Sequence, residues 1–214
     1  MKTRSRCVLG LSVHTGWAAC VVAGGSVRAP LLAAREEIEL LGDLDRFVYH
    51  SAAAAKKRSE AEASVARARK MAAERATDVL ARLVERASAG GHAIVACAIV
   101  AKKGEMLPLE NILAAHLRIH AAEAHLYRDV LRDAAEAIGL PARIVSPSDL
   151  ETASAMAMRV NPSELPALLV EVGRAVGRPW AKDQRAASLA AWMLLADPGS
   201  FGLPGPPVST TIGG

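Results

Sequence analysis

Two histidines, His116 and His120, stand four residues apart in a stretch that predicts a helix, and Glu123 follows close by. Side chains four apart lie on one face of a helix, so these two imidazoles can bind a transition metal together. The glutamate that directly follows the first histidine in zinc peptidases is missing here. A solvated helix edge, or an edge that faces a partner, is therefore the preferred interpretation of the pair.

Four acidic residues are candidates for a metal site of a different kind. Glu105, Glu110 and Asp149 follow predicted strands, where α/β proteins place their sites, and Asp183 lies near the start of the last predicted helix. Gathered at one place, four carboxylates would suit catalysis with divalent ions. The alternative is that these residues have structural roles in solvated loops and caps, with Asp183 stabilising the dipole of its helix, and we favour this alternative.

A serine and a histidine, Ser12 and His14, lie two residues apart at the end of the first apolar run. Such a pair serves as nucleophile and base when an acidic group orients the imidazole. No acid that would orient His14 is evident in the sequence. The two side chains are therefore interpreted as polar binding groups rather than as catalytic ones.

Basic residues gather at two places that suit contacts with phosphate groups. Lys56, Lys57 and Arg58 lie in a long predicted helix, and Lys102 and Lys103 follow a central predicted strand. Contacts of this kind with DNA or RNA do not depend on base sequence and weaken steeply as salt rises. A solvated helix face is the alternative for the first group. The net charge of +4 permits nucleic-acid binding without requiring it, and 3% aromatic residues leave few side chains for stacking on bases.

The composition is that of a globular protein, with 51% hydrophobic and 22% charged residues, and no apolar stretch reaches the roughly 20 residues of a membrane-spanning helix. The basic start at residues 1–6 leads into a predicted strand rather than a signal peptide, so we expect a cytoplasmic protein without a membrane partner.

Cys7, Cys20 and Cys97 all lie in apolar stretches. They are expected to be buried, reduced thiols rather than parts of a disulfide framework or a zinc site.

The elements that must position these groups alternate in type along the chain. Apolar runs separated by turns predict three strands at residues 7–12, 16–23 and 31–41, and further strands at 92–101 and 143–146. Helices are predicted at 51–86, as one long helix or two stacked ones, at 109–138, from 161 to 173 or 177, and at 182–196. The stretch from 147 to 161 is expected to be looser.

This order of elements predicts a mixed α/β sheet flanked by helices. The first three strands can pair as an antiparallel meander, and strands that alternate with long helices pair in parallel through right-handed crossovers. We expect one domain over residues 1–197. The Pro/Gly-rich segment at 198–214 is poor in core residues and is expected to be a disordered tail.

Three segments resemble the RuvC-like resolvases of the ribonuclease H-like superfamily. Residues 8–18 (VLGLSVHTGWA) are similar to that family's opening hairpin, which reads apolar-Gly-Ile-Asp-Pro-Gly and then Thr-Gly-Trp or Thr-Gly-Tyr. Residues 144–148 (IVSPS) and 182–190 (KDQRAASLA) resemble its fifth strand with the following Pro-Ser and its last, Asp-containing helix. The matches span nearly all of residues 7–196, and the resemblance implies a ribonuclease H-like α/β fold.

The resemblance also implies where metal-binding acids would stand. RuvC-like nucleases hydrolyse phosphodiesters with two divalent ions, which need several carboxylates that converge at strand ends. Here Ser12 stands in place of the first-strand acid, His14 in place of the glycine beside it, and Ala96 or Cys97 in place of the fourth-strand acid. Asp183 keeps one acidic position on the last helix, but two alanines one turn later leave the second one without a carboxylate.

We therefore expect a catalytically degenerate RuvC-like domain that serves as a binding or assembly module, with DNA or RNA as its first candidate partner. Ser12, His14, Ala96, Cys97 and Asp183 would mark the vestigial site, and no cofactor is expected. One alternative is an active nuclease that uses Mg²⁺ or Mn²⁺ with a rearranged acidic set. Another is a homo-oligomeric scaffold with the long Ala-rich helix as its interface.

Overall fold

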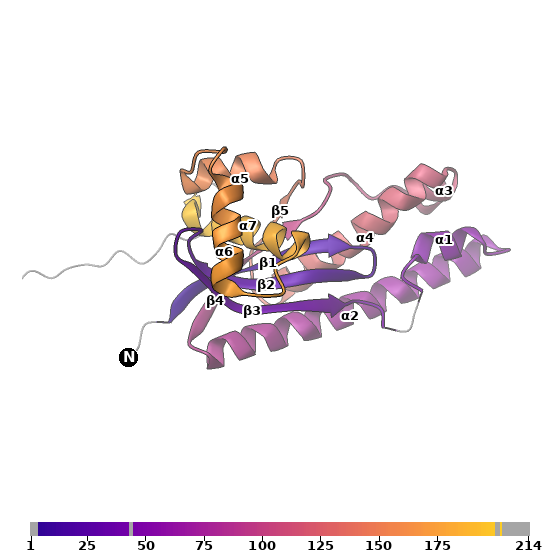
Figure 1. Ribbon diagram of the computed structural model, residues 1–214. Helices are drawn as coiled ribbons and strands as arrows, with labels where there is room; N and C mark the ends of the chain where they lie inside the picture. The colour runs from indigo at the N-terminus through magenta and orange to yellow at the C-terminus, as the bar shows by residue number, and fades with distance from the viewer. Residues whose placement is uncertain (1–3, 43–44, 200–201, 203–214) are drawn as a thin grey trace, which may run out of the picture.

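Within residues 4–42, 45–199 and 202, which this computed structural model describes, five strands form one sheet in the order β3-β2-β1-β4-β5 (Figure 1). The strands are β1 Ser5–His14, β2 Trp17–Gly25, β3 Pro30–Glu39, β4 His92–Val100 and β5 Ala142–Val145. Neighbours in β1, β2 and β3 pair antiparallel, whereas β4 pairs parallel with both β1 and β5. The predicted meander and parallel pairing are confirmed, and most of the expected tail at 198–214 lies outside the described residues.

Helices of the described residues cover both faces of the sheet (Figure 1): α1 Val48–Ala53, α2 Arg58–Ala89, α3 Leu109–Leu113, α4 His116–Ala137, α5 Leu150–Met158, α6 Leu165–Val176 and α7 Lys182–Ala196. Side chains alternate across a strand, so Leu9 and Leu11 of β1 pack with α1 to α4, while Val8 packs with α5, α6 and α7. The two resulting cores make a three-layer α/β/α structure. None of these helices has the length and hydropathy needed to cross a bilayer.

The long helix α2 lies against the sheet through small side chains. Its buried face consists almost entirely of alanine and leucine: Ala61, Ala68, Ala72, Ala76, Leu80, Leu83 and Ala87. Alanine favours the helix and lets it approach the sheet and α4 closely. The predicted helix at 51–86 is divided in the structure, because Lys57 is extended (φ −125°, ψ 142°) and separates the short α1 from α2.

Two helix predictions need correction. The stretch predicted as one helix at 109–138 is broken into α3 and α4, because Ala115 is extended (φ −153°, ψ 132°) and redirects the chain so that Ile112 is buried. The stretch expected to be loose contains α5, which follows Asp149 and ends where Arg159 adopts a left-handed conformation (φ 54°). Ala155 of α5 is fully buried in the core that α5 shares with α7. Tertiary packing thus stabilises a helix whose periodicity is weak.

Helix α7 lies unusually close to β1. A Cβ placed on Gly10 of β1 would stand 2.0 Å from the carbonyl oxygen of Ala187 on α7. Ala187, Ala190 and Ala191 of α7 are fully buried against the sheet. A glycine on the strand and alanines on the helix therefore allow the backbones to meet, and this contact brings the first turn of α7 to the end of β1.

The edge strand β3 is tied to the segment between α6 and α7. Arg35 Nη1 donates hydrogen bonds of 2.8 Å to the carbonyl oxygens of Gly177 and Pro179, and its Nη2 donates one of 2.8 Å to that of Val176. The same strand carries three glutamates after Arg35: Glu36, Glu37 and Glu39. The edge of the sheet is thus charged and partly covered.

The three cysteines are buried, as expected, and their environments predict low reactivity. Burial raises the pKa of the Cys7 thiol to about 11 and also raises the pKa values of the Cys20 and Cys97 thiols well above their ordinary value. This raised pKa lowers the thiolate fraction of Cys7 at pH 8 about 100-fold. We expect no cysteine to react with Ellman's reagent within minutes in the native protein, whereas all three should react in guanidinium chloride. Rapid labelling of the native protein would contradict this burial.

Candidate functional site

A large cleft opens at the carboxyl ends of the parallel strands β1, β4 and β5. It has a volume of about 1220 Å³ and is lined by the ends of β1 and β4, by the segments that follow β4 and β5, and by parts of α4, α5, α6 and α7. Because the carboxyl ends of parallel strands lie at one edge, residues distant in sequence meet here. The cleft contains residues of the predicted site, among them Ser12, His14 and Asp183.

Ser12, His14 and Asp183 meet at the mouth of this cleft. The Ser12 hydroxyl donates a hydrogen bond of 3.1 Å to Asp183 Oδ1, and His14 Nε2 lies 2.8 Å from the same oxygen. The acid that was not evident near His14 in the sequence is therefore Asp183, which lies 169 positions later. The His14 ring also stacks on Trp17, with centroids 4.3 Å apart and planes 7° from parallel.

The arrangement is not that of an activated nucleophile. Ser12 donates to the carboxylate rather than to the imidazole, so His14 is not placed to take the hydroxyl proton. The His14 side chain is 40% exposed and that of Asp183 is 27% exposed, so both remain open to the cleft. The three residues form a small polar group suited to hydrogen bonding with a ligand.

The expected positions on β4 need correction. Ala96 and Cys97 are fully buried, one in each core, and neither lines the cleft. The register of β1 and β4 places Cys97 opposite Leu9, whereas Val100 is opposite Ser12. The residue beside Ser12 at the mouth of the cleft is therefore Val100. It is apolar, like the Ala96 or Cys97 that was expected at this position.

The rearranged acidic set is not assembled in the structure. Glu110 forms an ion pair of 2.8 Å with Arg58 outside the cleft, and Glu105 is exposed in the loop after β4. Asp149 lies 3.9 Å from Lys103, and none of these three acids lines the cleft with Asp183. Among the described residues, the one group of three side chains close enough to share a metal contains no carboxylate. A pair of Mg²⁺ or Mn²⁺ ions, which select several oxygen ligands, does not fit this site.

Basic side chains dominate the charged lining of the cleft. Lys102 and Lys103 line it, as do Lys182 and Arg185 from the first turn of α7, whereas its carboxylates among the described residues are Glu151 and Asp183. The sequence prediction missed the two basic residues of α7, although they are three residues apart on the predicted helix and stand on either side of Asp183. Three other candidates lie at the junction of α1 and α2 and do not line the cleft: Lys56, Lys57 and Arg58.

The loop that carries Lys102 and Lys103 is held by buried groups on α4. Arg128, which is 3% exposed, donates from Nη1 to the Lys102 carbonyl oxygen over 2.9 Å. Its Nε and Nη2 lie 2.9 and 2.8 Å from Asp129 Oδ1. His125 also contacts this loop, and its pKa is lowered mainly by burial, so its ring is neutral near pH 7. The two lysines are thus presented by a fixed backbone.

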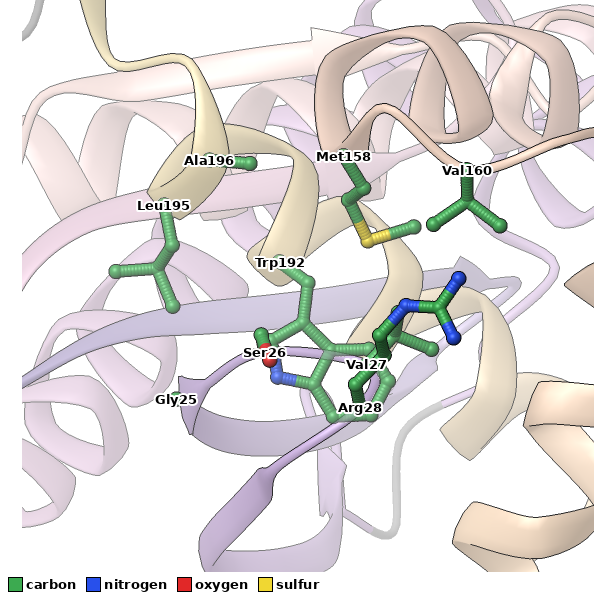
Figure 2. Close-up of a pocket in the computed structure, with 9 residues that line it drawn as sticks. All are labelled: Gly25, Ser26, Val27, Arg28, Met158, Val160, Trp192, Leu195 and Ala196. Atoms are coloured by element: carbon green, nitrogen blue, oxygen red, sulfur yellow. The ribbon is translucent and has the colours of Figure 1, made fainter.

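A second pocket of about 150 Å³ lies at the other end of the β2–β3 hairpin (Figure 2). Figure 2 shows the indole of Trp192 between the turn at residues 25–28 and Met158. Trp192 Nε1 donates to the Gly24 carbonyl oxygen over 3.0 Å, and Arg28, which also lines the pocket, lies 3.4 Å from Glu164. These contacts link α7, and Glu164 at the N-cap of α6, to the hairpin.

The fold is shared with solved structures, although the sequence matches no family model and no curated protein. Thermus thermophilus RuvC in complex with a Holliday junction substrate aligns with a TM-score of 0.55 and 13% identity, over 92% of this chain and 98% of that chain. A structure of Thermus thermophilus RuvC alone aligns with a TM-score of 0.53 and 12% identity over the same shares. The chain has the RuvC fold. This confirms the expected RuvC-like, ribonuclease H-like architecture, and at these identities the similarity concerns the fold alone.

Proposed function

We propose that this RuvC-like chain binds nucleic acid in the cleft at the strand ends and does not cleave it. The observation that supports this most is the excess of positive charge in the cleft lining. Four basic side chains line the cleft against two carboxylates: Lys102, Lys103, Lys182 and Arg185 against Glu151 and Asp183. A positive cleft attracts the phosphate backbone. DNA is the first candidate, because the RuvC neighbour is in complex with a Holliday junction substrate.

Cleavage by two divalent ions would depend on the ligands that the mouth of the cleft can offer. A two-metal site holds its ions about 3.5–4 Å apart between several anionic oxygens. At the mouth of this cleft Asp183 stands beside the hydroxyl of Ser12 and the apolar Val100. The Asp183 carboxylate is also engaged by His14, so it is a poor candidate for bridging two ions.

The cleft lysines should contribute directly to DNA affinity. We expect Lys102→Ala/Lys103→Ala to weaken binding to a four-way junction and to reduce the slope of log affinity against log salt by about 2, since each phosphate contact contributes about 0.9. Fluorescence anisotropy at several salt concentrations measures both quantities. Lys56→Ala/Lys57→Ala is the matched control, because it removes the same charge outside the cleft. Equal losses in the two double variants would refute binding in the cleft.

Incubation of the protein with branched DNA, single-stranded DNA and RNA–DNA hybrids in Mg²⁺ or Mn²⁺ tests the second half of the proposal. We expect no cleavage above that of a buffer control. Cleavage that disappears in Asp183→Asn would overturn the proposal and establish the rearranged nuclease. The same variant should bind DNA at least as well as the parent protein, because it removes a negative charge from the cleft.

The scaffold alternative receives less support. The Ala/Leu face of α2 that suggested an interface is buried within the chain, against the sheet and α4. An interface on this helix would have to use its charged outer side, where Arg82 pairs with Asp78 and Lys70 lies near Glu74. Light scattering that showed a stable oligomer, together with no salt-dependent DNA binding, would favour the scaffold instead.

A further inference from the structure

Three histidines meet at one end of α4, outside the polar group of Ser12, His14 and Asp183. His50 comes from α1, and His116 and His120 come from the first two turns of α4. One ring nitrogen of each lies within 4.8 Å of those of the other two. His116 Nε2 and His120 Nε2 are 2.9 Å apart, and the His50 ring centroid is 5.3 and 4.8 Å from those of His116 and His120.

A buried carboxylate orients the third histidine. Glu123, one turn beyond His120 on α4, is 2% exposed, and its Oε1 accepts a hydrogen bond of 2.7 Å from the Tyr49 backbone. The same oxygen lies 3.4 Å from His50 Nδ1. When Nδ1 donates to this carboxylate, Nε2 of His50 carries the free lone pair. A carboxylate behind an imidazole is the usual outer partner of a metal-binding histidine.

We propose that His50, His116 and His120 bind one divalent transition-metal ion, with zinc as the representative ion, and that Glu123 positions His50. Three imidazoles suit zinc and its neighbours in the first transition row, whereas Mg²⁺ prefers oxygen ligands. Two nitrogens at about 2.0–2.1 Å from a tetrahedral zinc are about 3.3 Å apart, so small side-chain rotations from the observed positions complete the site. The ion would link α1 to α4.

From the sequence, His116 and His120 were interpreted as a solvated helix edge or an edge that faces a partner. The position of His50 next to them changes this interpretation. Two exposed histidines at helical spacing are common, but a third imidazole with a buried carboxylate behind it is not explained by solvation. The dipole of α4 disfavours a cation near its first turn, but this effect is weak beside three coordination bonds. His120 also lines the cleft, so the ion would lie close to the proposed DNA-binding surface.

Zinc titration of the full, tag-free chain tests the site. In competition with a chromophoric chelator, we expect one zinc per chain, and excess Mg²⁺ should not displace it. His116→Gln and His120→Gln change exposed side chains and should leave the fold intact, but each should weaken zinc binding about 100-fold or more. Glu123→Gln should weaken it about 10- to 100-fold, as expected for an outer partner. Co²⁺ in the parent protein should give the intense visible bands of a four-coordinate ion.

His92→Gln is the matched control, because it removes a histidine at the start of β4, outside the cluster. Circular dichroism of each variant shows whether a loss of binding reflects unfolding. The proposal is supported if zinc raises the melting temperature of the parent protein and His92→Gln but not of His120→Gln. It is overturned if the parent protein fails to compete with the chelator, or if His116→Gln and His120→Gln bind zinc as tightly as His92→Gln does.

Discussion

Replacing Arg128 by methionine is expected to lower the free energy of unfolding by about 3 kcal/mol. The change leaves the carboxylate of Asp129 buried without its main partner, and it leaves the Lys102 carbonyl oxygen without its donor. Removing one member of a buried ion pair costs about 3–5 kcal/mol. We expect the lower end of that range, because Arg132 Nη1 remains 3.2 Å from Asp129 Oδ1. Urea denaturation followed by circular dichroism measures the difference.

Arg132→Met is the control for this prediction. Its side chain is 36% exposed and pairs with both Asp129 and Asp133, so its loss should cost no more than about 1 kcal/mol. The double variant Arg128→Met/Asp129→Leu should recover much of the stability, since apolar replacement of a whole buried pair is often neutral. If Arg128→Met and Arg132→Met lowered the free energy of unfolding equally, the buried Arg128–Asp129 pair would not contribute more to stability than the exposed one. DNA affinity should fall in Arg128→Met, because the loop of Lys102 loses its support.

Replacing Gly10 by alanine is expected to destabilise the protein by about 2 kcal/mol. The new methyl group would stand 2.0 Å from the Ala187 carbonyl oxygen, and a backbone atom of a packed helix cannot turn aside. Overpacking of this kind costs about 1–3 kcal/mol, occasionally more. Alanine also gains about 0.5–1 kcal/mol over glycine in a strand, and the clash exceeds this gain. Thermal and urea denaturation of the purified variant measure the net change.

Gly199→Ala is the matched control for Gly10→Ala, because a Cβ at Gly199 would meet no atom within 4 Å. It should change the free energy of unfolding by less than about 0.5 kcal/mol. The two variants add the same methyl group, so the difference between them isolates the contact of β1 with α7. If Gly10→Ala proved as stable as Gly199→Ala, the close approach of helix and strand would be wrong.

The strands were predictable from the sequence because their apolar runs are separated by clear turns. The turns that contain Gly16 and Gly25 both have positive φ at the glycine, as tight connections require. Helix α5 was not predictable, since its stability depends on packing against α7. The break at Ala115 was missed for a similar reason, because no glycine or proline marks it and only the burial of Ile112 explains it.

The candidate site was predictable in part. The resemblance placed Ser12 and Asp183 at one mouth, and the structure brings them within hydrogen-bonding distance. The β4 positions were misplaced because a continuous apolar run gives no information about register. His50 was missed because it approaches α4 only through the tertiary packing of α1, so no spacing along the chain relates it to His116.

The charged strand at the edge of the sheet has a consequence for how the protein behaves at high concentration. An open strand is a template for added strands, which leads to domain swapping and fibril growth. In this chain Arg35 donates hydrogen bonds to the α6–α7 segment, and Glu36 is paired with Arg86 of α2. The carboxylates of Glu37 and Glu39 would repel those of a second copy laid alongside. At the opposite edge, β5 has only four residues and offers little length for pairing. Both edge strands of the sheet therefore disfavour pairing with another molecule, although the strands between them are among the most apolar segments of the sequence.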